Sequence, residues 1–212
     1  MHRKKIVVVG SGTAGKTSFI HRLVHDTFQQ NYKATVFDNI THHFTPTSGT
    51  YADQTFELEI WDTSGQDSYD RLRPLAYEKV DVSLICFNVA DKLGFSLVEE
   101  KWLPEIRHHC VNSKLVLVGL KNDLRKELPS ILVNVNAAKV LARKYSCLYL
   151  ECSAMLGENV NEVMERALEL SMEMDEEAAN MQDYQYNSMG RGYNSMKKKI
   201  KKSANGGSCK IS

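Results

Sequence analysis

The stretch VVVGSGTAGKTSFI, residues 7–20, determines the fold class. It joins an apolar run to a glycine-rich turn, and Lys16 and Thr17 follow the turn. The spacing Gly10-x4-Gly15-Lys16-Thr17 matches a loop that holds phosphate groups, because glycine lets the backbone N–H groups approach phosphate oxygens closely. In such a loop the lysine reaches the terminal phosphates, and the threonine hydroxyl is suited to Mg²⁺. A plain glycine turn between a strand and a helix remains the alternative at this point.

Further apolar runs follow along the chain, and segments able to form helices separate most of them. The runs are KIVVVG, FELEIWD, VSLICFNV, KLVLVGL and CLYLECS, and the helical segments are 16–25, 95–108, 135–145 and 159–173. Strands alternating with helices favour a doubly wound α/β sheet, and wholly apolar runs are typical of buried parallel strands. Residues 40–61 alternate more and contain Ser48-Gly49, which predicts an antiparallel hairpin at one sheet edge.

Composition and charge are those of one globular domain with a distinct tail. The chain has 212 residues, 42% of them hydrophobic, and a net charge of +1. Residues 190–212 contain seven basic residues and no acidic ones, so the remainder holds 20 basic and 26 acidic residues and is mildly acidic. We expect a domain at 1–176 and a flexible polybasic tail at 177–212, since the tail lacks apolar residues for a core. Such a tail favours an anionic surface as its partner.

The cysteines and the N-terminus indicate a reducing compartment. Five scattered cysteines without a CxxC pair favour free, mostly buried thiols over a disulfide framework. MHRKKIVVVG lacks the apolar core of a signal peptide, and no apolar run approaches the length of a membrane span. We therefore expect a cytosolic protein.

Polar residues follow three further strands, at the sheet edge where ligands of such folds bind. Asp62 is placed to hold Mg²⁺ through water, and the Gly65 N–H to meet a γ-phosphate. Asp123 is placed to accept hydrogen bonds from the N1 and 2-amino groups of guanine, a donor pair that adenine lacks. Lys121 would lie along the base, and the backbone N–H groups of Ser153 and Ala154 would meet the guanine O6. Each of these features alone also fits an ordinary cap or turn. Together with the phosphate loop they make four such features, each following a strand in the expected order, which favours a nucleotide site.

At this point the sequence resembles the small GTPases of the Ras superfamily, and within them the Rho/Rac family. The resemblance covers residues 4–174, and its most specific parts are YKATVFDN (32–39) and WDTSGQDSYDRLRPLAY (61–77), which resemble the two Rho-type switch segments. It implies a P-loop G domain with a six-stranded, mostly parallel sheet, one antiparallel edge strand and helices on both faces. The chain is about ten residues shorter where Rho proteins carry an additional helical insert, which makes it an atypical member.

The resemblance also implies residue roles. Phe28 would pack on the guanine and Tyr32 would cover the phosphates; an exposed aromatic in a loop is the less favoured alternative for Tyr32. Thr17 and Thr35 would ligate Mg²⁺, Thr35 only in the presence of the γ-phosphate. The residues that would wrap the phosphates are Gly12, Thr13, Ala14, Gly15, Lys16, Thr17 and Ser18.

The implied reaction is slow GTP hydrolysis that times a switch. Gln66 would orient the attacking water, with Lys16 and Thr35 beside the phosphates, because phosphoryl transfer mainly requires positioning and charge stabilisation. No arginine near the phosphate loop is obviously placed to reach the transition state, and a structural or partner-binding role is favoured for Arg71 and Arg73. We expect hydrolysis on the order of 10⁻⁴ to 10⁻³ s⁻¹, accelerated by a partner's arginine.

The implied partners are an exchange factor, a GTPase-activating protein that supplies an arginine, a GDP-dissociation inhibitor and effectors. Effectors would bind Val36, Phe37 and Asp38 in the GTP state, and we favour a partner over local packing for the two apolar residues. A role in cytoskeletal signalling is implied by the family alone.

Three residues depart from the family pattern. Leu120 stands where asparagine or threonine is usual, so a polar side chain that braces the phosphate loop is missing. Ser64 replaces a common alanine, and Ser11 a common aspartate. We expect guanine selectivity to persist and nucleotide exchange to be somewhat faster than is typical.

The chain ends in Cys209-Lys210-Ile211-Ser212, which fits a prenylation box of the farnesyl type. A lipid together with the adjacent lysines forms the two-signal arrangement that holds a protein at a membrane, and the family resemblance implies the plasma membrane. A stray cysteine in a disordered end is the alternative. Nucleic-acid binding by the basic cluster ranks second, because no aromatic residues interleave with it.

Two other classes of protein compete with the switch. A P-loop ATPase or small-molecule kinase would need a lid with arginines and would lack the Lys121-x-Asp123 pair. A silent scaffold that holds GTP permanently would have lost Gln66 or substituted Gly12, and both residues are intact.

Overall fold

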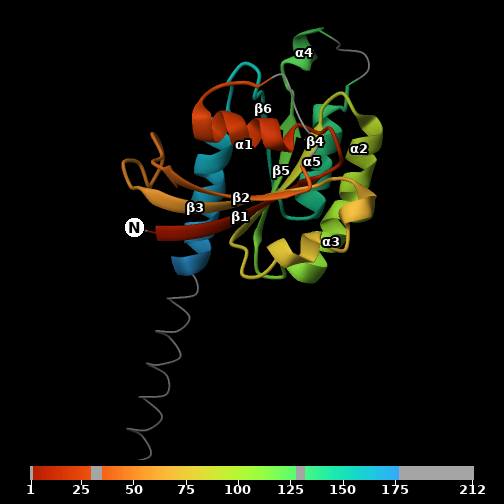
Figure 1. Cartoon of the computed structure of the whole chain (residues 1–212). Coiled ribbons are helices and arrows are strands. Elements are labelled where there is room, and N and C mark those ends of the chain that lie inside the picture. Colours follow the sequence, from red (N-terminus) through yellow and green to blue (C-terminus); the bar gives the residue numbers. More distant parts are fainter. Residues whose placement is uncertain (1, 30–34, 128–131, 177–212) are drawn as a thin grey trace, which may run out of the picture. The chain divides into compact units, whose positions relative to one another are not determined.

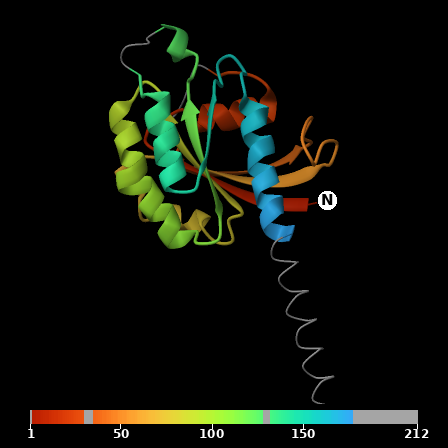
Figure 2. The ribbon, with the colours of Figure 1, turned by 180° about the vertical axis from the view of Figure 1, so that it is seen from behind.

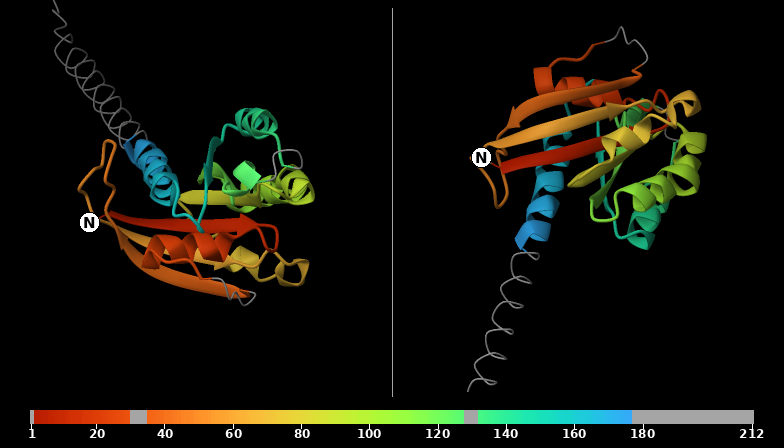
Figure 3. Two further views of the ribbon diagram at one scale, coloured as in Figure 1. Left: turned by 90° about the horizontal axis from the view of Figure 1, so that it is seen from above. Right: turned by 60° about the horizontal axis from the view of Figure 1, so that its bottom comes forward.

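A six-stranded sheet forms the centre of the molecule, in a computed structural model that describes residues 2–29, 35–127 and 132–176 (Figure 1). The strand order is β2-β3-β1-β4-β5-β6. The strands are β1 (His2–Gly10), β2 (Phe37–Phe44), β3 (Phe56–Thr63), β4 (Val82–Asn88), β5 (Lys114–Leu120) and β6 (Leu148–Cys152). Only β2 and β3 pair antiparallel among these strands, and β2 lies at the edge (Figure 3). The predicted α/β fold with one antiparallel edge strand is confirmed.

The helices connect the strands largely as the sequence predicts. They are α1 (Lys16–His25), α2 (Lys92–Leu97), α3 (Leu103–His109), α4 (Leu124–Glu127) and α5 (Val135–Lys144). A π-helical turn, η3 (Val98–Trp102), joins α2 to α3, so that helical structure runs from 92 to 109 rather than from 95 to 108. Two short 3₁₀ turns, η1 (Asp67–Tyr69) and η2 (Arg73–Ala76), follow β3, and a further helix starts at residue 160.

The chain divides into two compact units, residues 1–171 and 172–212. The first unit holds the sheet and the helix that begins at 160, and the described residues 172–176 of the second are helical. Every helix in the described ranges is too short or too polar to cross a bilayer.

Both faces of the sheet carry helices (Figure 2). On one face, α2, η3, α3 and α5 bury apolar side chains against β1, β4 and β5, with Trp102 and Phe87 among the largest. On the other, α1 and the helix from 160 supply buried residues such as Phe19 and Leu168. Burial of this apolar area is the main stabilising contribution to the fold. Cys86, Cys110, Cys147 and Cys152 are free thiols, and only Cys147 is not fully buried.

The connection from β5 to α5 is short. The four-residue helix α4 follows β5, residues 128–131 lie outside the described ranges, and α5 begins at Val135.

Candidate nucleotide site

A pocket of about 470 Å³ opens at the carboxyl ends of the parallel strands. Nine of the predicted nucleotide-binding residues line it, namely Thr13, Gly15, Lys16, Thr17, Ser18, Phe28, Lys121, Asp123 and Ala154. Gln29, Leu120, Leu124 and Met155 also line it, and the motifs gave no signal for the contributions of Gln29, Leu124 and Met155. One concave site therefore brings together the phosphate loop and the two segments predicted to read the base.

The phosphate loop needs its glycines because of close backbone contacts and left-handed dihedrals. A Cβ at Gly10 would lie 2.0 Å from the carbonyl oxygen of Cys86 on the neighbouring strand, and Gly15 has φ +107°. Lys16, the first residue of α1, is buried and donates from Nζ to the carbonyl oxygens of Gly10 (2.6 Å) and Ser11 (3.0 Å). Burial lowers the pKa of this lysine from its usual value. The ammonium group is thus held along the loop that is expected to receive phosphates.

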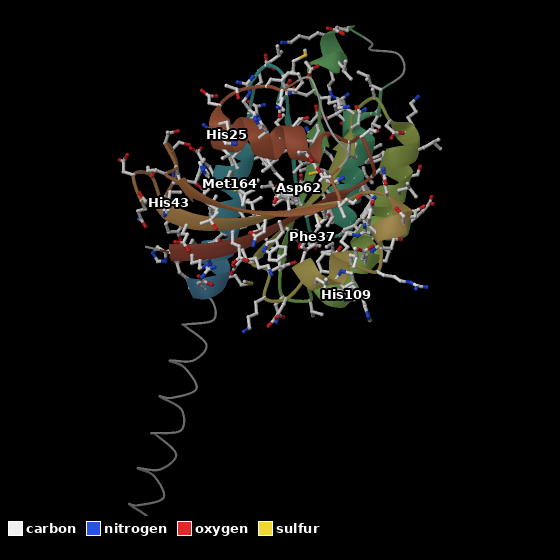
Figure 4. The ribbon with its side chains drawn as sticks, in the orientation of Figure 1. His25, Phe37, His43, Asp62, His109 and Met164 are labelled. Atoms are coloured by element: carbon white, nitrogen blue, oxygen red, sulfur yellow. The ribbon has the colours of Figure 1, made fainter. Side chains whose placement is uncertain are left out.

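A cluster of oxygen atoms lies behind the phosphate loop. The Thr17 hydroxyl is 2.9 Å from the Thr35 hydroxyl and donates to the Asp62 carboxylate. Asp62 is 2% exposed, and burial raises the pKa of its carboxyl group above the usual value. Figure 4 shows it beside the sheet, below α1 in that view. Its Oδ1 is buried and has no hydrogen-bond partner among the described residues, and oxygen donors are the ligands that Mg²⁺ prefers, so this set fits Mg²⁺.

The segment after β3 touches the phosphate loop through its backbone. A Cβ at Gly65 would lie 2.3 Å from the Gly10 carbonyl oxygen and 2.4 Å from the Gly12 nitrogen, so no side chain fits at position 65. Gln66 is exposed, and its backbone N–H donates to the Ser64 hydroxyl over 3.3 Å. The side chain of Gln66 is therefore at the surface next to the loop.

The predicted base-reading residues are held in place by hydrogen bonds. The Ser153 hydroxyl donates to the Asp123 carboxylate over 2.5 Å and accepts from the Leu156 N–H over 3.1 Å. Lys121 donates from Nζ to the Thr13 carbonyl oxygen over 2.9 Å, which ties the base segment to the phosphate loop. Leu120 is buried and packs 3.7 Å from the position of a Cβ on Gly15.

The first switch segment contributes an exposed and a packed apolar residue. Val36 is 45% exposed, which agrees with a surface that a partner would cover. Phe37 instead packs edge-on against Trp61, with ring centroids 5.1 Å apart. Local packing, the less favoured expectation, thus accounts for part of the Phe37 side chain. Asp38 is exposed and its carboxylate accepts from the Asn39 N–H.

The second switch segment is organised by Arg73, whose importance the sequence did not reveal. Its guanidinium is 1% exposed, donates to Glu105 from Nε (2.6 Å) and to the Ser64 carbonyl oxygen (2.7 Å), and pairs with Asp70. It also lies 4.7 Å from the centre of the Trp102 ring. These contacts agree with the structural role favoured for Arg73, while Arg71 is exposed. Tyr32 and Cys209 lie outside the described residues.

A phosphate loop, a buried strand-end carboxylate and a separate base-reading segment around one pocket define a P-loop nucleotide-binding domain. The family model described as "Ras family" matches residues 5–173. The chain therefore belongs to the Ras family, and its relatives place it among the Rho-type small GTPases, which bind GTP.

Those relatives are themselves described as GTP-binding. The chain is 41% identical over 166 residues to "GTP-binding protein RHO4" of Saccharomyces cerevisiae, covering 77% of this chain and 56% of that protein. It is 40% identical over 180 residues to "GTP-binding protein rho4" of Schizosaccharomyces pombe, covering 80% and 86%. It is 41% identical to "Ras-like GTP-binding protein RHO1" of Entamoeba histolytica, covering 78% and 74%. The chain thus spans little more than half of the Saccharomyces cerevisiae relative but most of the other two.

Proposed function

We propose that this protein is a guanine-nucleotide-dependent switch that hydrolyses GTP slowly and engages effectors in its GTP state. The observation that carries the proposal is the position of Asp123. Ser153 holds this carboxylate at one end of the pocket that the phosphate loop lines at the other. A carboxylate in that position accepts the N1–H and 2-amino donors of guanine, whereas adenine offers no such pair.

In the proposed mechanism the chain mainly positions the substrate. Lys16 binds the terminal phosphates, and the backbone from Gly12 to Ser18 surrounds them at the start of α1, where helix N–H groups favour anions. Gln66 orients the attacking water from the exposed side of the loop. Thr17, Thr35 and Asp62, the last through water, would hold Mg²⁺, which neutralises phosphate charge when bound. Arg73 is held by Glu105, Asp70 and Ser64, so we assign the transition-state arginine to a partner.

Switching follows from contacts that the γ-phosphate makes with Thr35 and Gly65. Their loss on hydrolysis releases both segments, so effectors that bind around Val36, Phe37 and Asp38 distinguish the two states. An exchange factor, a GTPase-activating protein and a GDP-dissociation inhibitor are the expected regulators. We further propose that lipidated Cys209 and the lysine-rich tail place the protein at the cytoplasmic face of the plasma membrane, with a cytosolic pool, in cytoskeletal signalling.

The dissociation rate of a fluorescent GDP from the purified chain tests the nucleotide assignment. Displacement by excess GTP and not by ATP is expected, and Asp123→Ala should weaken GDP binding at least about 10-fold, because it removes two hydrogen bonds to a charged group. Asp53→Ala, at an exposed carboxylate, is the matched control. Displacement by GTP and ATP alike would favour a P-loop ATPase or small-molecule kinase instead.

Removal of the metal is a second, independent test. Chelation of Mg²⁺ with EDTA should accelerate GDP release by about 10-fold or more, since phosphate charge is then no longer neutralised. The Asp62→Ala variant should release GDP fast with or without EDTA. An EDTA response as large in Asp62→Ala as in the unaltered chain would remove Asp62 from the metal site.

A further inference from the structure

Arg22, on α1, hydrogen-bonds the 154–155 segment, which lines the nucleotide pocket, and the end of its own helix at Asp26. Neither Arg22 nor Asp26 lines that pocket. Its Nε donates to the Ala154 carbonyl oxygen over 2.7 Å, and its Nη2 donates to the Met155 carbonyl oxygen over 2.9 Å. Its Nη1 donates to the Asp26 carbonyl oxygen over 2.7 Å. One guanidinium group thus makes three hydrogen bonds to the backbone of two segments.

The two segments belong to the base end of the pocket. Ala154 and Met155 both line the pocket. Asp26 ends α1 in the left-handed region, with φ +52°, two residues before Phe28, which also lines the pocket. The contacts of Arg22 therefore connect the 154–155 segment to the end of α1, where the chain continues to Phe28.

The guanidinium is enclosed rather than free to move at the surface. The Arg22 side chain is 16% exposed, and a Cβ at Gly157 would lie 3.7 Å from its Cζ. The planar, permanently charged guanidinium loses little freedom per hydrogen bond formed, and lysine cannot reproduce its forked set of donors. The Asp26 carboxylate is 3.6 Å from Nη1 but 99% exposed, so the backbone contacts dominate.

We propose that Arg22 is a positioning residue that slows release of the guanine nucleotide by holding the 154–155 segment against the end of α1. This inference rests on the proposed function, because it assigns the residue to the base end of that same site. The N–H of Ala154 is expected to donate to the guanine O6, and the carbonyl oxygen of Ala154 accepts the hydrogen bond from Arg22. Arg22 and the Lys121–Thr13 contact together stabilise a site in which Leu120 replaces the usual polar brace.

The test is the dissociation rate of fluorescent GDP in Mg²⁺ buffer with excess unlabelled GTP. Arg22→Ala should accelerate release by about 10-fold or more, because several hydrogen bonds to a charged donor are lost at once. Arg22→Lys, which keeps the charge but not the fork, should give an intermediate rate. Asp26→Asn, which removes the exposed carboxylate charge, tolerates the left-handed backbone and keeps the backbone acceptor, should stay within about twofold of the unaltered chain.

Single-turnover hydrolysis of preloaded GTP separates positioning from a general loss of structure. Arg22 contacts neither the phosphate loop nor Gln66 in the structure, so hydrolysis in Arg22→Ala should keep its rate while release accelerates. GDP release from Arg22→Ala at the unaltered rate, or a parallel loss of hydrolysis, would overturn the proposal. If Arg22→Ala does not fold, the rates of GDP release and of GTP hydrolysis in Arg22→Lys test the proposal in its place. Absence of GDP binding by the unaltered chain would instead contradict the proposed function.

Discussion

Leu120 stands where the resemblance to the Rho family leads us to expect asparagine or threonine. It is buried against Gly15 of the phosphate loop and offers that loop no hydrogen bond. Lys121 bonds the Thr13 carbonyl oxygen, so one polar tie between the base segment and the loop is present. The phosphate loop is thus held by a hydrogen bond from Lys121 and by apolar packing of Leu120.

Restoring a polar side chain at position 120 should slow nucleotide release. Leu120→Asn places an amide beside the phosphate loop, and one additional net hydrogen bond, about 1 kcal/mol, corresponds to about a fivefold slower GDP dissociation. Leu120→Ala is the control, because it removes the same apolar contact without adding a donor or acceptor. A Leu120→Asn rate at or above that of Leu120→Ala would show that the loop needs no such brace.

At the scale of elements, Arg73 and Glu105 connect the second switch segment to α3. Arg73 on η2 is buried, and Glu105 accepts from both its Nε and its Nη2, and from the Tyr77 hydroxyl. Burial alone would lower the pKa of Arg73, but the hydrogen bonds from Arg73 to Glu105 and Asp70 raise it above its usual value. The Arg73 guanidinium therefore stays charged, and removing Glu105 would leave this buried group with Asp70 as its carboxylate partner.

Glu105→Gln should therefore lower the free energy of unfolding by about 2 kcal/mol, because Arg73 loses the charged hydrogen bonds to Glu105 but keeps those to Asp70 and Ser64. Urea unfolding in saturating GDP measures this difference. Lys126→Ala breaks an exposed ion pair with Glu158 and should change the free energy of unfolding by no more than about 0.5 kcal/mol. Equal effects of the two substitutions would mean that Arg73 finds other acceptors.

A second contact between elements joins the β2–β3 connection to the helix that begins at residue 160. The Glu165 carboxylate accepts from the Thr47 N–H (2.7 Å), the Thr47 hydroxyl (2.9 Å) and the Ser48 hydroxyl (2.7 Å). Burial opposes ionisation, but these donors outweigh it and hold the pKa of Glu165 below its usual 4.5. Because the folded pKa is the lower one, the stabilisation is complete above 4.5 and is lost as the pH falls through the folded value.

Glu165→Gln should lower the free energy of unfolding by about 1 to 2 kcal/mol at pH 7, and its loss of stability in acid should be smaller than that of the unaltered chain. Urea unfolding at several pH values between 7 and 3.5 measures both effects. Glu162→Gln, at an exposed carboxylate on the same helix, should leave the pH profile unchanged. If the free energy of unfolding of Glu165→Gln fell with pH in parallel to that of the unaltered chain, the Glu165 carboxylate would not be the source of the loss of stability in acid.

For the whole molecule, the sequence predicted the parts that depend on local pattern. Apolar runs and glycine spacing predicted the strands and the motif that follows each of them. Asp62 and Asp123 come at strand ends, and the sequence therefore placed them at the ligand-binding edge, because the carboxyl ends of parallel strands lie at one edge of the sheet. The sequence did not predict the contact of Arg22 with residues 154–155 or that of Arg73 with Glu105, because these acceptors lie 32 or more residues away along the chain. The packing of Phe37 on Trp61 depends on the register of two strands, which alternation alone does not determine.

The two tryptophans of this chain contact different switch segments. Trp61, the first residue of the second switch segment, packs against Phe37 of the first segment. Trp102 contacts Arg73 of the second segment and donates from its indole N–H to the Ser11 hydroxyl of the phosphate loop (3.3 Å). The unlabelled protein therefore carries its own optical reporters. Intrinsic fluorescence should change as bound GTP becomes GDP. Trp61→Phe should abolish the part of this change that reports on the contact with Phe37, and Trp102→Phe the part that reports on the contact with Arg73. If both segments relax together, the two single-tryptophan signals will share one time course, whereas sequential release will separate them.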